Sequence, residues 1–90
     1  MATEFTATST AQVASNNVLR KAITFSVPVG PGTLYILCQD EEPEDTPSAT
    51  NHDLFVPAGQ LLTLGGEHWK GSVWAAFSEA DSSALIRVYL

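Results

Sequence analysis

The last third of the chain reads as three consecutive β-strands, and this stretch limits the possible folds more than any other. Gly, Ser or Asp residues bound each strand, and the strands are predicted at residues 60–64, 69–77 and 83–90. In the last of them Ile86 and Val88 alternate with Leu85 and Arg87, which is the period of a strand with one buried face. Because this strand ends in apolar residues, we expect it to be an inner strand of a sheet.

Further strands are predicted upstream, which brings the total to seven or eight short strands. Val, Ile, Thr and Phe favour strands, and Gly, Pro and Asn residues separate the runs. The predicted strands cover residues 3–8, 10–14, 19–29, 33–38 and 53–56. No helix of useful length is predicted. We therefore expect one all-β domain spanning residues 1–90, built as a small antiparallel β-sandwich or a jelly-roll-like barrel.

Period-two alternation also predicts which side chains form the core. The strand at 33–38 is apolar throughout, so both of its faces are expected to be covered, and the strands at 69–77 and 83–90 are expected to form a hairpin. The predicted core consists of Ile23, Phe25, Leu34, Ile36, Val73, Ala75, Ile86 and Val88.

Two segments stand apart from this core. Residues 1–15 are rich in Thr, Ser and Ala and are expected to form an edge or arm segment, in which Phe5 has no evident place in the chain's own core. Residues 39–51 combine acidic side chains with two prolines and lack periodicity, which predicts an exposed acidic loop that folding does not need.

Composition limits the partners of the chain. The net charge of −6 disfavours binding to nucleic acid and to anionic membrane surfaces. The single cysteine, Cys38, excludes an internal disulfide, and neither a signal peptide nor an apolar run of about 18 residues is present. We expect a protein synthesised in a cytoplasm, with no membrane segment.

No motif in the sequence predicts catalysis or a cofactor. His52 and Asp53 are adjacent on a strand, so their side chains point to opposite faces and do not form a triad, and no nucleophile-elbow pattern occurs. The two histidines match no zinc spacing. Calcium binding by residues 40–45 stays an open alternative to a solvated loop, although the spacing is not that of a calcium loop. The chain is therefore predicted to be neither an enzyme nor a cofactor protein.

Four residues are candidates for binding a partner protein. Arg20 and Lys21 hold half of the positive charge, and they could dock on an acidic neighbour or pair with the chain's own acids. Trp69 follows a Gly-Gly turn and is a candidate surface anchor, whereas Trp74 lies within an apolar strand and fits the core or an interface. Phe5 completes the set.

Five short segments together resemble the small β-sandwich virion proteins of tailed bacteriophages. The segments are 17–25 (NVLRKAITF), 32–36 (GTLYI), 54–59 (LFVPAG), 70–75 (KGSVWA) and 85–88 (LIRV). The chain differs from the family pattern in residues 27–31, in its longer acidic loop and in having Trp74 where Tyr is common.

The resemblance implies a structural protein without chemistry, most specifically a capsid decoration (cement) protein that stabilises the head shell. It implies a virion location, synthesis in the bacterial host cytoplasm, a major capsid protein or other virion protein as partner, and a homo-oligomer, with a trimer as the expected state. The alternative is a receptor- or carbohydrate-binding module of a head fibre or tail. Trp69 distinguishes the two: a neighbouring subunit over Trp69 favours the first, and an open cleft with Asp or Glu beside it favours the second.

Overall fold

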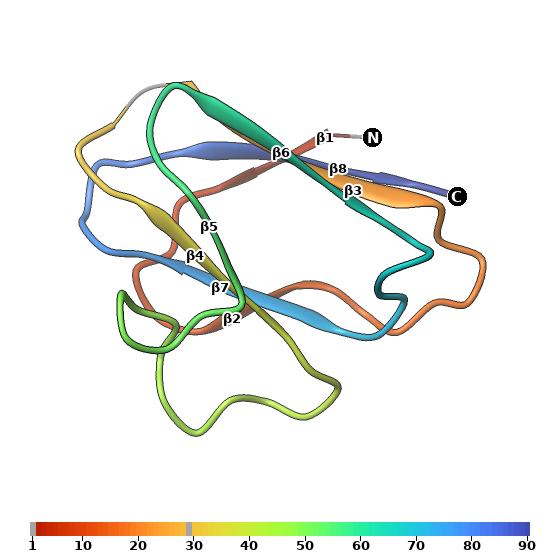
Figure 1. Cartoon of the computed structure of the whole chain (residues 1–90). Coiled ribbons are helices and arrows are strands. Elements are labelled where there is room, and N and C mark those ends of the chain that lie inside the picture. The colour runs from red at the N-terminus through yellow and green to blue at the C-terminus, as the bar shows by residue number, and fades with distance from the viewer. Residues whose placement is uncertain (1, 29) are drawn as a thin grey trace.

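The computed structural model describes residues 2–28 and 30–90, apart from the side chain of Ala2, and all regular structure in this part of the chain is β-strand. Eight strands form two antiparallel sheets of four (Figure 1). The strands are β1 (Ala2–Phe5), β2 (Ala11–Ala14), β3 (Ala22–Val27), β4 (Leu34–Cys38), β5 (Leu54–Val56), β6 (Gln60–Gly65), β7 (Val73–Phe77) and β8 (Ala84–Tyr89). The predicted all-β sandwich is confirmed, with Val29 of the predicted third strand outside the described residues.

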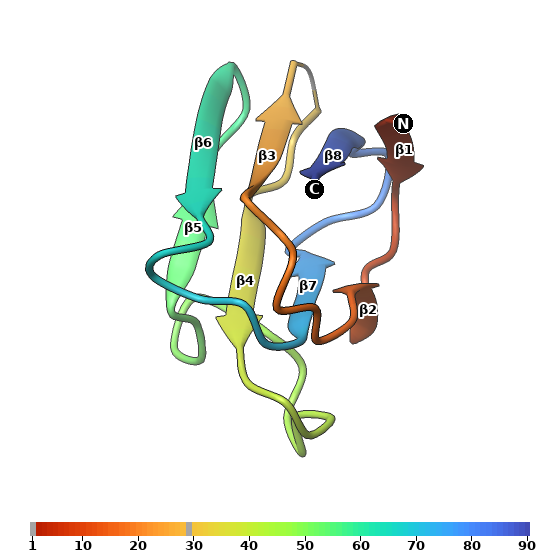
Figure 2. The same cartoon turned by 90° about the vertical axis from the view of Figure 1, so that its right-hand side faces the viewer.

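The order of the strands is that of a jelly roll. Sheet A has the order β1-β8-β3-β6 and sheet B has the order β2-β7-β4-β5, and the two sheets lie face to face in Figure 2. Each strand of the first half pairs with the strand that holds the same place counted back from the C-terminus. The four pairs are β1–β8, β2–β7, β3–β6 and β4–β5. This is the arrangement of a long antiparallel ribbon wrapped into two sheets. As predicted, β8 is an inner strand, and the N-terminal segment supplies an edge strand to each sheet.

The predicted hairpin between the last two strands is wrong. β7 lies in sheet B between β2 and β4, whereas β8 lies in sheet A between β1 and β3. Residues 78–83 cross between the sheets, which are about 10 Å apart in a sandwich of this kind. Two hydrogen bonds fasten this crossing to the turn before β4: Gly32 N–H donates to Ser82 Oγ at 2.9 Å, and Thr33 N–H donates to Ser78 Oγ at 2.9 Å.

The core lies between the two sheets and contains the predicted residues. Seven of the eight are buried, and Val88 is half-buried and packs against them. The register explains why: Phe25 of β3 stands opposite Leu62 of β6 and Ile86 of β8, so that one row of inward side chains crosses the sheet. Alternation with period two therefore predicted the inward set correctly.

A second, smaller apolar layer covers the outer face of sheet B. Leu37 of β4 and Ala76 of β7 point away from the core, yet both are buried. The loop at 39–51 lies on this side of sheet B in Figure 1, its Pro43 and Pro47 are buried, and Trp74 donates its indole N–H to the carbonyl of Gln39 at 2.8 Å. The acidic side chains of the loop are exposed as expected, but the loop is not wholly solvated, because its two prolines are buried. That folding does not need the loop stays a prediction.

Candidate functional site

Phe5, the first candidate partner-binding residue, packs inside the domain. It lies on β1, and its ring stands 6.0 Å from that of Phe77 on β7, across the space between the sheets. It is half-buried against the core cluster. The expectation that Phe5 lacks a place in the chain's own core is therefore wrong, and it leaves the set of docking residues.

Arg20, the second candidate, is 1% exposed and holds three segments of backbone together. Its Nη1 donates to the carbonyl of Ser15 at 2.9 Å, and its Nη2 donates to the carbonyls of Gly71 at 2.7 Å and Trp69 at 3.3 Å. Burial lowers the pKa of the guanidinium, which still carries its charge at neutral pH. A side chain so enclosed cannot dock on an acidic neighbour, so Arg20 is corrected to a structural residue.

Trp69 and Lys21 remain available to a partner to different degrees. Lys21 is exposed, whereas Trp69 is half-buried and packs against the core cluster. The indole N–H of Trp69 donates to the carbonyl of Ser72 at 2.9 Å, which fixes the ring over Gly71, where a Cβ would collide with it. The structure thus brings Arg20 and Trp69 together at one end of the sandwich, and Trp69 is an immobilised ring rather than a fully exposed anchor.

A shallow depression surrounds Trp69 where three loops meet. Its volume is about 470 Å³, and residues from the loops before β3, after β4 and before β7 line it: Asn16, Val18, Asp40, Gly66, Glu67, His68, Trp69, Lys70 and Gly71. Asp40 joins the three loops, because its Oδ1 accepts from Asn16 Nδ2 at 3.1 Å and from Ser72 N–H at 3.0 Å. We call this hollow the Trp69 depression. It offers a ring edge, two carboxylates and an ammonium group to a polar ligand.

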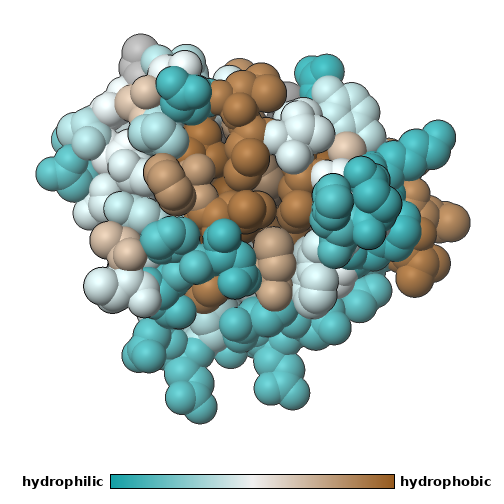
Figure 3. Space-filling model, viewed as in Figure 1, coloured by the Kyte–Doolittle hydropathy of each residue, from teal (hydrophilic) through white to brown (hydrophobic). Residues whose placement is uncertain are grey.

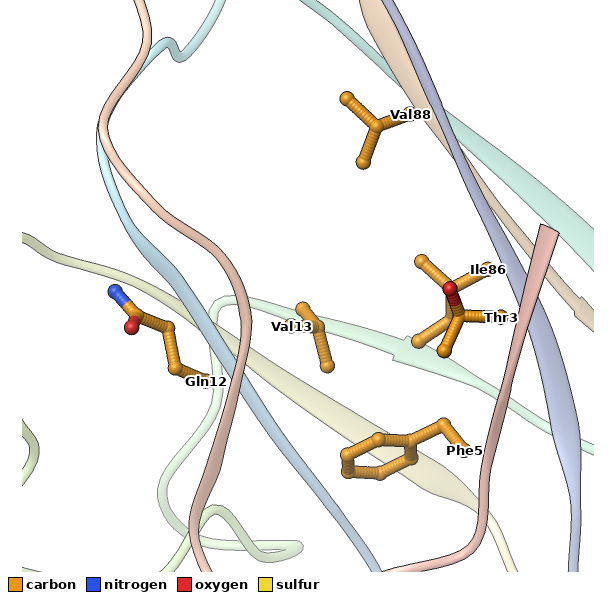
Figure 4. A pocket seen from close by; sticks show the side chains of 6 residues that line it. All are labelled: Thr3, Phe5, Gln12, Val13, Ile86 and Val88. Atoms are coloured by element: carbon orange, nitrogen blue, oxygen red, sulfur yellow. The ribbon is translucent and has the colours of Figure 1, made fainter. Parts of the chain in front are cut away.

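A second opening lies between the sheets, at the side bounded by the edge strands β1 and β2. It has a volume of about 130 Å³, and Figure 4 shows side chains of β1, β2 and β8 around it: Thr3, Phe5, Gln12, Val13, Ile86 and Val88. None of these side chains titrates, so the opening offers no group for acid–base chemistry. Its size and lining suit a small apolar group.

The sequence-based reasoning missed the exposed apolar side chains. Among the described residues these are Val18, Leu19, Phe55, Leu61, Leu85, Tyr89 and Leu90. Figure 3 shows apolar atoms gathered on the face that Figure 1 presents with β5 and β6 in front. The signal was present in the sequence, because residues 54–66 carry no charge. A contiguous exposed apolar patch is typical of an interaction surface.

Among the described residues, the remaining titratable side chains do not gather at one place to form a catalytic or metal-binding cluster. In the described part of the chain no group of three or more His, Cys, Asp or Glu side chains is placed to hold a metal ion. His52 packs between Tyr35 and Phe55 with ring centroids 5.2 and 5.5 Å away, and His68 lies 3.6 Å from Glu67 on the surface. Among the described residues no helix has the length and apolarity to cross a membrane.

Cys38 should resist alkylation in the native protein. Burial, and then the nearby carboxylate of Asp53, raise the pKa of the thiol to about 11, although Arg20 opposes the shift. At pH 8 only about one thiol in a thousand is then ionised, against roughly a quarter in an unfolded chain. We expect iodoacetamide at pH 8 to label Cys38 about 100-fold more slowly in buffer than in urea, as followed by mass spectrometry.

The same shift has a consequence for stability at high pH. Because the folded state holds the thiol proton more tightly than the unfolded chain, stability falls as the pH rises from the ordinary thiol pKa towards 11. For the iodoacetamide experiment, equal rates of Cys38 labelling in buffer and in urea would contradict the burial of this thiol.

Comparisons of the chain with protein-family models, with curated proteins and with solved structures find no match.

Proposed function

We propose that this chain is a non-enzymatic structural protein of a tailed-bacteriophage virion, most specifically a capsid decoration protein. It would be made in the bacterial cytoplasm, assemble as a homo-oligomer, and stabilise the head shell by contacts with the major capsid protein or another virion protein. The observation that carries the proposal is the number of large apolar side chains exposed on so small and acidic a domain, seven in the described residues. Where such side chains adjoin one another on a surface, they favour docking of another protein.

The uncovered face of sheet A is the surface best suited to such docking. The outward side chains of its central strand β3 are small: Ser26 stands between Leu61 and Leu85, and Ala22 stands beside Tyr89. Leu61, Leu85 and Tyr89 are exposed, whereas the loop at 39–51 covers the corresponding face of sheet B. A flat face with large apolar side chains around a row of small ones complements another flat protein surface.

Co-sedimentation tests this proposal. The purified chain is mixed with assembled shells of the phage that encodes it and centrifuged through sucrose. We expect the chain in the shell fraction, and we expect Leu85→Lys and Tyr89→Lys together to reduce the bound amount at least tenfold. Val18→Lys, a change at a still more exposed apolar residue outside the strands of sheet A, serves as the control. A chain that stays at the top of the gradient at every concentration would contradict the proposal.

The docking residues differ from those suggested by the sequence. Deleting residues 1–14 would remove an edge strand from each sheet and take Phe5 out of the core, so such a truncation tests folding rather than docking. Point substitutions on exposed side chains are therefore the appropriate probes.

A second candidate function, recognition of a carbohydrate or receptor, is favoured by the Trp69 depression. There Trp69 lies beside Asp40 and Glu67 in an open hollow, which is the arrangement that distinguishes this alternative. Sugar rings stack on aromatic side chains, and carboxylates accept hydrogen bonds from their hydroxyls. Titration of intrinsic fluorescence with chitotetraose and maltotetraose tests it. A response that Trp69→Ala removes would support recognition of a sugar, and no response to either would count against that class of ligand.

A further inference from the structure

The four open edges of the two sheets differ in how they are protected. Proteins blunt exposed edges with short strands, charges, prolines or bulges, because an unprotected edge pairs with other chains. β1 has four residues and carries Glu4, β2 has four residues and an irregular register after Gln12, and β5 has three residues followed by Pro57. β6 has six residues, no charge, no proline and an unbroken register with β3. No further strand lies beyond β6 in Figure 2.

The register shows which backbone groups of β6 are free. Gly66 N–H donates to the carbonyl of Lys21 at 2.6 Å, and this pair continues the β3–β6 register. In an antiparallel pair alternate residues exchange both backbone hydrogen bonds. The Gly65 carbonyl already accepts from His68 N–H at 3.0 Å and Trp69 N–H at 3.3 Å, and Gln60 N–H donates to the carbonyl of Pro57 at 3.2 Å. Leu64 and Leu62 therefore bond to β3, whereas both backbone groups of Leu61 and Thr63 and the N–H of Gly65 point away from the sheet. The side chains of Leu61 and Thr63 lie on the outer face of sheet A.

We propose that β6 pairs with β6 of a second copy of this chain, antiparallel and about a two-fold axis at Thr63. This inference rests on the proposal that the protein assembles as a homo-oligomer. In this register Thr63 stands opposite Thr63 of the second copy, Leu61 opposite Gly65, and Leu62 opposite Leu64. Both backbone groups of Thr63, the carbonyl of Leu61 and the N–H of Gly65 then find partners, and the two sheets join into one of eight strands. Because the contact closes with two copies, the unit is a dimer rather than the trimer that the family resemblance implies.

The side chains make a second copy a fitting occupant of this edge. Leu62 and Leu64 face the interior and are half-buried, so pairing them across the axis covers apolar surface at the open side of the sandwich. On the outer face the two Thr63 side chains meet, and such pairs are favourable across antiparallel strands. The chain carries a net charge of −6, yet residues 54–66 are uncharged. The carboxylate of Glu67, the nearest acid, lies beside Gly65, which would stand opposite Leu61 of the other copy, so no two carboxylates oppose each other there.

A charge-swap experiment tests the pairing. Thr63 is exposed, so Thr63→Lys and Thr63→Glu leave the monomer intact but place like charges directly opposite each other in the dimer. Sedimentation equilibrium of the purified chain should give a dimer, and each variant alone should raise the dimer dissociation constant at least tenfold. An equimolar mixture of the two variants should restore the dimer, because opposite charges then meet. Thr24→Lys, one strand further in on the same row, should not change the dimer.

Several outcomes would overturn the inference. These are a monomeric chain at all concentrations up to 1 mM, variants that dimerise as well as the unmodified chain, and a mixture that stays monomeric. Loss of the dimer with Thr24→Lys and not with Thr63→Lys would assign self-association to the face of sheet A instead. Each variant's thermal melting curve is measured alongside to confirm folding. The assay needs no shells, so a dimer that does not bind shells separates this inference from the proposed function.

Discussion

Replacing Ile86 by Asp should unfold the domain, whereas replacing its neighbour Leu85 by Asp should leave it folded. Ile86 is 4% exposed and stands opposite Phe25 in the core, while Leu85 is 50% exposed on the outer face of sheet A. An unpaired carboxylate at position 86 costs on the order of 5 kcal/mol, comparable to the stability of a domain of about this size. Circular dichroism and urea titration of the two variants measure the difference.

The Leu85→Asp variant is the matched control, because both changes place the same side chain on the same strand. Its free energy of unfolding should change by less than about 0.5 kcal/mol, as for most surface substitutions. A folded Ile86→Asp variant, or an unfolded Leu85→Asp variant, would mean that β8 presents its other face to the core.

The strands and the core were predictable from the sequence because both depend on neighbouring residues. All eight strands fall within or next to the predicted segments, and the inward set of β3 follows directly from the alternation of Ile23, Phe25 and Val27. A strand with one buried face fixes its own side-chain pattern, whatever its partners are. That is why the core could be named before the strand order was known.

The partners of each strand were not predictable in the same way. The connection at 78–83 contains the Ser, Glu and Asp residues of an ordinary hairpin loop, yet it crosses from sheet B to sheet A. The hydrogen bond that holds this crossing joins Ser82 to Gly32, 50 residues away. No local pattern separates a crossing of this kind from a hairpin. The partial packing of the loop at 39–51 was not predictable either, since composition does not reveal that its two prolines are buried.

Two of the four candidate docking residues, Phe5 and Arg20, turned out to be structural, because charge and aromaticity do not reveal burial. Arg20 and Lys21 are adjacent and chemically alike, but the first is enclosed and the second is exposed. The carbonyls that receive the Arg20 side chain come from residues 15, 69 and 71, so only the assembled loops make the site. The unprotected edge of β6 was also hidden, because an edge is a property of the strand order.

Replacing Arg20 by Ala should destabilise the domain by roughly 3–5 kcal/mol. Three carbonyls, of Ser15, Trp69 and Gly71, lose their donors; the bond to Gly71 is buried and the other two are part-buried. An unpaired buried acceptor costs about 1–3 kcal/mol, and less where water can reach it. Arg20→Lys should recover less than half of the loss, because an ammonium group cannot span acceptors that a planar guanidinium fork reaches together. Urea denaturation of both variants gives the free energies.

Arg87→Ala is the matched control. It distinguishes the loss of the enclosed hydrogen bonds of Arg20 from the loss of one positive charge. Arg87 is exposed on sheet A, and Arg87→Ala lowers the net charge by the same amount, so it should change stability by less than about 0.5 kcal/mol. The loops at 15–21 and 66–72 should also loosen in Arg20→Ala alone, seen as faster amide exchange at Asn17, whose N–H donates to the carbonyl of Lys70 at 2.9 Å. If Arg20→Ala were as stable as Arg87→Ala, the guanidinium would not be what joins these loops. Asp40 and Lys70, whose side chains also bridge them, would become the residues to test.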